Sequence, residues 1–170
     1  MRIHVDLETR SMVDLRKTGV YPYAADPSTE VLILAHGNQD GVYVCTDHDR
    51  IIEEAEHIRD SDCTVHAFNA SFERAIFRDV LGVDIPLERW RCTMVQAYSR
   101  GFNGGLKQVG DQLKCKAHKD SAGTALINKF SKMEAKGFKQ PDEDPEAFNQ
   151  FIQYCAQDVR AEVEIYEALQ

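Results

Sequence analysis

The stretch that most constrains the fold lies at the start of the chain. Over Ile3–Thr9, apolar and polar residues alternate, which is typical of a β-strand with one buried face. Because successive side chains of a strand point to opposite faces, Asp6 and Glu8 share a face. Two neighbouring carboxylates repel each other and are costly to bury unless a cation compensates. The pattern therefore predicts either a site for a hard divalent cation, such as Mg²⁺ or Mn²⁺, or a strand whose polar face is simply exposed to solvent.

Length and composition favour a single globular domain in the cytoplasm. The chain has 170 residues and 43% hydrophobic residues, which is enough for one domain with its own core. It contains no run of roughly 18 apolar residues and no basic segment followed by a long apolar one, so we expect no membrane span and no signal peptide. Its five cysteines occur singly, without a Cys-x-x-Cys pair, which argues against zinc ribbons and redox motifs.

The charge pattern limits how the chain could bind nucleic acid. The formal net charge is -8, which disfavours a protein that holds nucleic acid by charge alone. It does not exclude an enzyme that acts on nucleic acid, because bound metal ions offset an acidic site. Basic residues concentrate between positions 89 and 119, and acidic residues between 142 and 146. Either run could also be ordinary solvated surface.

The first half of the chain predicts the strands of a sheet and two helices. We expect strands over 30–36, 42–46 and 63–68, a turn at Asp40-Gly41, a turn-rich segment over 21–27 and a helix over 49–58. Apolar spacing then predicts a helix from an N-cap at Ser71 to near Gly82. Glu73 would lie in its first turn, directly after a strand. Open α/β sheets place their sites at that point, although a glutamate there could merely complement the helix dipole.

The second half predicts mostly helices. A strand or strand-to-helix passage is expected over 90–95, and helices over 106–113 and 121–132, the latter with Ser121 as N-cap. Asp144-Pro145 is typical of an N-cap followed by proline at the first helical position. In the closing helix, apolar residues recur every three or four positions, and Tyr154 and Asp158 lie one turn apart beside them. These two residues could face the sheet or could be a rim packing residue and an exposed acid.

Three motifs in this order resemble the DEDD (DnaQ-like) superfamily of 3′–5′ exonucleases. They are Asp6-Leu7-Glu8, Asn69-x-x-Phe72-Glu73 and Tyr154-x-x-x-Asp158. The chain resembles the tyrosine-type branch (DEDDy), because a histidine-type relative would carry histidine where this chain has Gln153. The resemblance is closer still to the N-terminal proofreading exonuclease region of bacteriophage-type family A DNA polymerases, on the segments 19–24, 66–74 and 90–94.

The resemblance implies a fold and a chemistry. The fold would be α/β and ribonuclease H-like, with a central mixed sheet flanked by helices, in a single exonuclease domain over 1–170. Two Mg²⁺ or Mn²⁺ ions would be held by Asp6, Glu8, Glu73 and Asp158, and the Tyr154 hydroxyl would orient the attacking water. The superfamily usually has aspartate where this chain has Glu73, so the second ion would be held differently or through water.

Five residues are candidates for substrate contact. Asn69 would position the Glu73 turn or touch the substrate, Met12 could wedge between the last two bases, and Phe102 could stack on a base. Thr9 and Lys107 complete the set, and Lys114 and Lys119 are further candidates for phosphate contact. Each of these residues is also compatible with plain packing or surface roles.

The expected substrate is the single-stranded or frayed 3′ end of DNA, from which 5′-nucleoside monophosphates would be released. A DNA polymerase is a further expected partner, in a bacterial or phage-infected cytoplasm. The chain could be a free-standing enzyme, a proofreading subunit or a polymerase fragment. Two alternatives stay open: an exonuclease of the same fold that trims RNA 3′ ends, and a non-catalytic module that binds nucleic acid or a polymerase.

Overall fold

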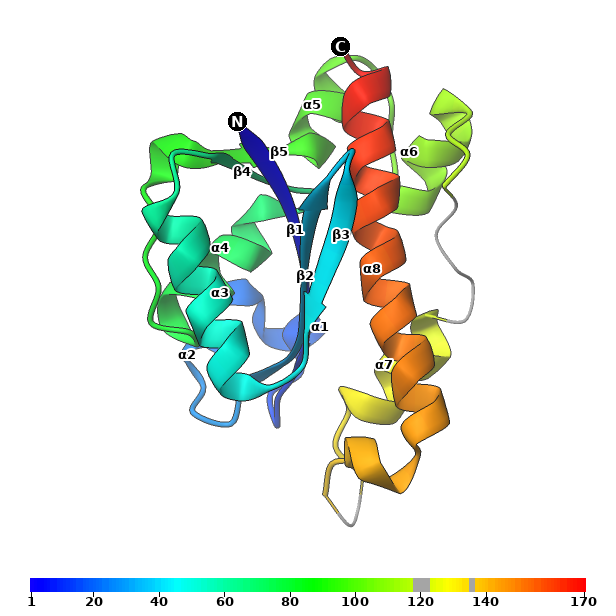
Figure 1. Cartoon of the computed structure of the whole chain (residues 1–170). Helices are drawn as coiled ribbons and strands as arrows, with labels where there is room; N and C mark the ends of the chain where they lie inside the picture. The colour runs from blue at the N-terminus through cyan, green and yellow to red at the C-terminus, as the bar shows by residue number, and fades with distance from the viewer. Residues whose placement is uncertain (118–122, 135–136) are drawn as a thin grey trace.

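A five-stranded mixed sheet forms the centre of the molecule. The computed structural model describes residues 1–117, 123–134 and 137–170. The strands lie in the order β3-β2-β1-β4-β5 (Figure 1). β1 is antiparallel to β2 and parallel to β4, β2 is antiparallel to β3, and β4 is parallel to β5. The strand bounds are β1 Arg2–Arg10, β2 Glu30–Asn38, β3 Gly41–Cys45, β4 Thr64–Ala67 and β5 Trp90–Cys92.

Helices cover both faces of this sheet. Figure 1 shows α3 and α4 on one side of the sheet and the long helix α8, with α6 and α7 beside it, on the other. The helix bounds are α1 Leu15–Thr18, α2 Val20–Ala25, α3 His48–Asp60, α4 Ala70–Asp79, α5 Thr93–Ser99, α6 Leu106–Leu113, α7 Gly123–Phe130 and α8 Pro145–Ala168. Two short 3₁₀ segments occupy Leu87–Arg89 and Pro141–Glu143. No helix in the described part of the chain is long and apolar enough to span a membrane.

The alternation of β1 decides which side of the sheet is acidic. Val5 and Leu7 point into the hydrophobic cluster under α3 and α4. The intervening Asp6 and Glu8 therefore point to the opposite face, which α8 covers. A second cluster on that face includes Ile33 of β2, Phe130 of α7 and Phe151 of α8. The two carboxylates thus lie between the sheet and its longest helix.

The predicted strands, the hairpin at Asp40-Gly41 and the closing helix are present in the structure. The Asp144 side chain accepts a hydrogen bond from the Ala147 N–H (3.1 Å), as expected of an N-cap. Two expectations were wrong. Most of the segment expected to be turn-rich belongs to a helix, Val20–Ala25. Pro22 does not prevent this helix because it falls in the first turn, where proline is tolerated. α4 starts after Asn69, not after Ser71, whose hydroxyl instead donates to the Asn69 side chain. Ser121 lies outside the described residues.

A buried polar cluster joins β1, β4 and α8 at one end of the sheet. The His4 and His66 rings lie 4.9 Å apart and both meet the Tyr166 ring. Glu162 approaches His4 (3.3 Å) and accepts a hydrogen bond from the Thr93 hydroxyl (2.7 Å). Burial, reinforced by the nearby positive groups, lowers the pKa of His66 to about 4.

Acid should therefore destabilise the protein through His66. Its folded pKa lies below its ordinary value of 6.5, so the unfolded chain takes up the proton first as the pH falls. The stability that neutral His66 provides is complete above pH 6.5 and is lost as the pH falls through about 4, and with solvent screening the loss reaches about 2 kcal/mol by pH 4.5. Urea unfolding at pH 7.5 and 4.5 measures it. We expect His66→Gln to lose less stability than the wild type over this interval, and His48→Gln, at an exposed histidine, to lose as much.

Candidate active site

The first part of the site is the face of β1 that carries Asp6 and Glu8. Asp6 is partly exposed and Glu8 is buried. The pairing of β1 with β2 shifts register between Glu8 and Thr9, which marks a bulge or irregularity just past the acidic pair. Bulges of this kind are common beside active sites, where they redirect side chains.

The second part is Glu73, in the first turn of α4. β4 runs parallel to β1 and ends at Ala67, so α4 begins at the same edge of the sheet toward which β1 carries its carboxylates. Glu73 is only 5% exposed, and among the described residues its Oε2 atom has no hydrogen-bond partner. Burial, together with the negative charges of Asp6 and Glu162, raises the pKa of Glu73 well above its ordinary value. A carboxylate in this environment would be stabilised by a bound cation.

The third part is α8, which crosses the sheet over β1 and β2. Tyr154 and Asp158 lie one turn apart on this helix, and both are buried. Burial raises the pKa of the Tyr154 phenol, and so do the charges of Asp158 and Glu8 and a hydrogen bond to Asp158. The phenol is therefore protonated at neutral pH and can act as a hydrogen-bond donor.

Cys155 is a contact that the sequence analysis missed. Its thiol donates a hydrogen bond to Asp6 Oδ2 (3.2 Å), and its sulfur lies 3.7 Å from the Asp6 carbonyl oxygen. Ligand atoms of Asp6, Glu8 and Cys155 all lie within 4.8 Å of one another. In the sequence, Cys155 is one of the apolar residues that recur along the closing helix, and this pattern alone predicts a core residue. Its position next to Tyr154 was the available signal.

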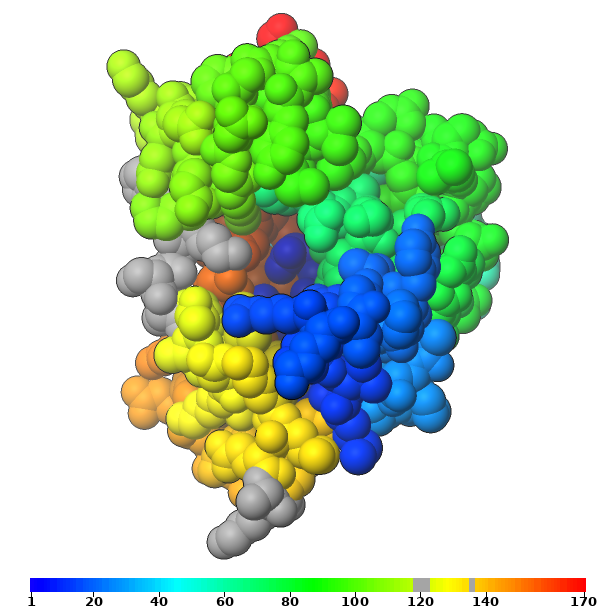
Figure 2. Space-filling model, turned by 180° about the vertical axis from the view of Figure 1, so that it is seen from behind, coloured from blue at the N-terminus to red at the C-terminus, as the bar shows by residue number. Residues whose placement is uncertain are grey.

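These three segments meet in one pocket of about 420 Å³. It is lined by all five predicted catalytic residues and by Asn69, with apolar walls around them, and none of these lining residues is basic. Figure 2 shows the hollow on the back of the molecule, with β1 and α8 visible at its floor and α7 and the segment after β1 on its rim. The full lining is Asp6, Leu7, Glu8, Leu15, Gly19, Val20, Asn69, Phe72, Glu73, Ile127, Tyr154 and Asp158.

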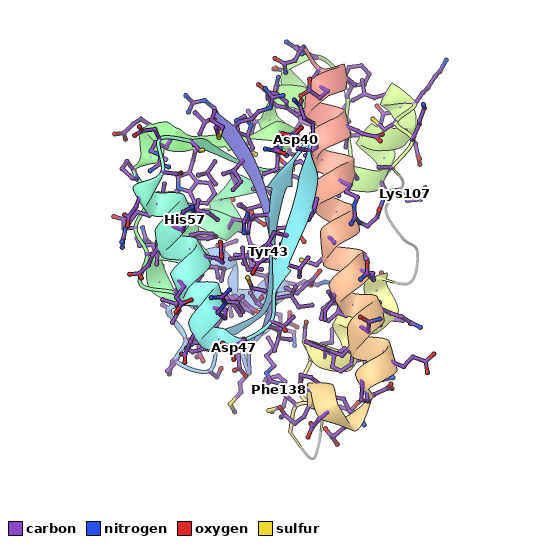
Figure 3. The ribbon with its side chains drawn as sticks, in the orientation of Figure 1. Asp40, Tyr43, Asp47, His57, Lys107 and Phe138 are labelled. Carbon is purple, nitrogen blue, oxygen red and sulfur yellow. The ribbon has the colours of Figure 1, made fainter. Side chains whose placement is uncertain are left out.

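The other predicted substrate residues that the structure describes do not line this pocket. Thr9 is buried and its hydroxyl is hydrogen-bonded to that of Tyr23 (2.8 Å). Met12 is 63% exposed, and Phe102 packs against the cluster between α5, α6 and α8. Lys107 pairs with Asp111 (2.8 Å), and Figure 3 shows it on α6, beyond α8 from the sheet. Lys114 is exposed at the C-cap of α6, and Lys119 lies outside the described residues.

The chemistry of the pocket fits divalent cations. Four carboxylates from β1, α4 and α8 line it. Carboxylate oxygens are the ligands that Mg²⁺ and Mn²⁺ prefer. Asp6, Glu8, Glu73 and Asp158 are therefore the side chains that could hold such ions.

Comparison with known proteins agrees with this fold. No family model matches the chain. A DNA polymerase of Bacillus phage SP02 is 36% identical over 177 residues, covering 94% of this chain and 26% of the polymerase, so the chain spans about a quarter of the length of this curated relative. A solved structure described as the apo form of the nuclease superposes with a TM-score of 0.54 at 12% identity, covering 99% of this chain and 70% of that one. The chain is thus related to part of a phage DNA polymerase, and its mixed α/β fold is ribonuclease H-like.

Proposed function

We propose that this chain is a metal-dependent 3′–5′ exonuclease domain that removes 5′-nucleoside monophosphates from DNA 3′ ends. The observation that carries the proposal is the pocket itself. Segments as far apart in sequence as β1, α4 and α8 bring four carboxylates and a tyrosine to a single hollow. A pocket in which carboxylates from three separate elements meet is the arrangement that a two-metal phosphodiester hydrolase needs, and this convergence favours a catalytic role over a purely structural one.

Two divalent ions held by Asp6, Glu8, Glu73 and Asp158 would neutralise the phosphate and stabilise charge on the attacking and leaving oxygens. The side chains around them have separate tasks. The protonated Tyr154 hydroxyl can hold the attacking water in line, since its raised pKa keeps its proton in place. Apolar side chains of the lining, such as Phe72 and Ile127, give a surface on which a terminal base can pack. Asn69 is exposed at the rim, where its amide can hydrogen-bond the sugar or phosphate.

The relation to a phage DNA polymerase favours DNA over RNA and a proofreading role beside a polymerase. The first test is digestion of 5′-labelled single-stranded DNA with Mg²⁺ or Mn²⁺, with a chelator control. The proposal expects a ladder that shortens one nucleotide at a time from the 3′ end. Parallel reactions with RNA and with 3′-mismatched duplex rank the substrates. Absence of cleavage under both metals would contradict the proposal and favour a binding module, and faster RNA cleavage would favour the RNA-trimming alternative.

The Cys155 thiol should contribute to metal affinity through Asp6. A group that hydrogen-bonds a metal ligand fixes its orientation, and loss of such a group costs about 10–100-fold in metal affinity or activity. We expect Cys155→Ala to weaken Mn²⁺ binding about tenfold in titration calorimetry, and Cys155→Ser, which keeps a donor, to weaken it less. Cys115→Ala is the matched control, because Cys115 is also buried but lies in the cluster of α6 and α8. Equal affinities for Cys155→Ala and the control would refute this role.

A further inference from the structure

The first residue of α7, Gly123, lies directly against the ring of Tyr154. A Cβ atom at position 123 would lie 2.1 Å from Cε2, 2.4 Å from Cζ and 2.8 Å from Cδ2 of that ring. All three distances are below 3.0 Å, which real Cβ contacts essentially never show. Any side chain at this position would therefore have to displace either the ring or α7.

The backbone of Gly123 gives no other reason for glycine. Gly123 is not among the glycines of positive φ, so an L-amino acid could adopt its conformation. Alanine is also a better helix former than glycine. What glycine provides at this position is space for the Tyr154 ring.

The ring has little freedom to move away. Tyr154 is 3% exposed and packs on Phe151, with ring centroids 6.2 Å apart and planes at 21°. Leu126 and Phe130 of α7 belong to the same hydrophobic cluster. Moving the closest ring atom from 2.1 Å to the 3.4 Å of ordinary contact requires a shift of about 1.3 Å. In active sites, misplacements of about 1 Å can cost about 10²-fold in rate.

We propose that Gly123 is a positioning residue for Tyr154. By carrying no side chain, it lets the ring lie under α7 with the hydroxyl at Asp158. Ile127, one turn later in α7, lines the pocket. Helix α7 therefore both lines the pocket and, through Gly123, positions the Tyr154 ring. The kinetic part of the inference rests on the exonuclease proposed above, whereas the steric part does not.

The kinetic test compares Gly123→Ala with Gly110→Ala. Gly110 is also a buried glycine in a helix, but a Cβ there meets only ordinary contacts, the nearest being Ile165 Cδ1 at 3.7 Å. On single-stranded DNA we expect Gly123→Ala to lower kcat at least tenfold, with KM and Mn²⁺ affinity within about twofold of wild type. Gly110→Ala should leave kcat unchanged. When Gly123→Ala is added to Tyr154→Phe, we expect a further loss in kcat of less than about twofold. The glycine substitution acts on catalysis through the Tyr154 hydroxyl, which phenylalanine lacks.

Two further measurements, a fluorine resonance and a melting temperature, do not depend on nuclease activity. In protein labelled with 3-fluorotyrosine, the Tyr154 resonance is assigned by its loss in Tyr154→Phe. It should shift in Gly123→Ala and stay in place in Gly110→Ala. If Gly123→Ala is too unstable to label, Tyr154→Ala removes the ring, and adding Gly123→Ala to it should change the melting temperature by less than about 2 °C.

The possible outcomes separate this inference from the proposed function. An unmoved Tyr154 resonance with unchanged kcat, or an additive loss of stability in the Tyr154→Ala background, overturns the positioning role. A wild-type protein without nuclease activity overturns the proposed function alone, while the fluorine and melting measurements still decide the positioning role.

Discussion

Asp6→Asn should lower the rate of 3′-end hydrolysis by at least about 10³-fold, the largest effect that we expect of any single substitution. Asparagine keeps the size of the side chain and removes its charge. Asp6 is the most central of the carboxylates: it lies on the strand at the middle of the sheet, it contacts Cys155, and its charge contributes to the raised pKa values of Glu73 and Tyr154. Metal ions supply several kcal/mol of charge stabilisation to a phosphoryl transition state, which corresponds to about three powers of ten.

The control for this substitution is Asp40→Asn. Asp40 is exposed in the turn between β2 and β3, and asparagine before glycine suits that turn as well as aspartate does. Single-turnover digestion of labelled DNA measures both variants, and the circular dichroism of each shows whether it is folded. We expect the control to keep wild-type activity. A folded Asp6→Asn protein within tenfold of the wild-type rate would show that the pocket is not where hydrolysis occurs.

The sequence predicted the parts of the site that depend on local pattern. Alternation in β1 was enough to place Asp6 and Glu8 on one face, and the strand-then-helix order was enough to place Glu73 in a first turn. The spacing of Tyr154 and Asp158 followed from the helical repeat. Each of these inferences needs only the residues of one element, and the structure brings all five side chains to the same pocket.

Contacts between distant elements could not be predicted in this way. Cys155 looks like any other apolar residue of the closing helix, and its contact with Asp6 exists only because α8 crosses β1. Gly123 is an ordinary glycine until α7 is placed on Tyr154. The same limit explains Thr9 and Phe102. Their residue types suit substrate contact, but tertiary packing pairs Thr9 with Tyr23 and places Phe102 in the cluster around α6.

Glu73→Gln should be more stable than the wild type without metal and less stable than the wild type with metal bound. Glu73 is buried near the negative charges of Asp6 and Glu162, and its pKa is raised above the ordinary value of 4.5. The stability that protonated Glu73 provides is complete below pH 4.5 and is lost as the pH rises through its folded pKa. Glutamine has no charge to bury, so in chelator at pH 7.5 we expect the variant to be more stable than the wild type by about 1–2 kcal/mol.

With metal bound, the wild type should be more stable than Glu73→Gln, because the negative charge of Glu73 that destabilises the metal-free protein is the charge that would bind the ion. A ligand at 100 times its Kd stabilises the folded state by about 2.7 kcal/mol. Wild type should gain this much with Mn²⁺, and Glu73→Gln should gain less because it has lost an anionic ligand. Glu88→Gln, at an exposed glutamate, should follow the wild type in both conditions. Thermal unfolding with chelator and with Mn²⁺ measures all three proteins. If the wild type were the more stable protein in chelator as well, the buried glutamate would stabilise the fold on its own, and the argument that this pocket is built for cations would fail.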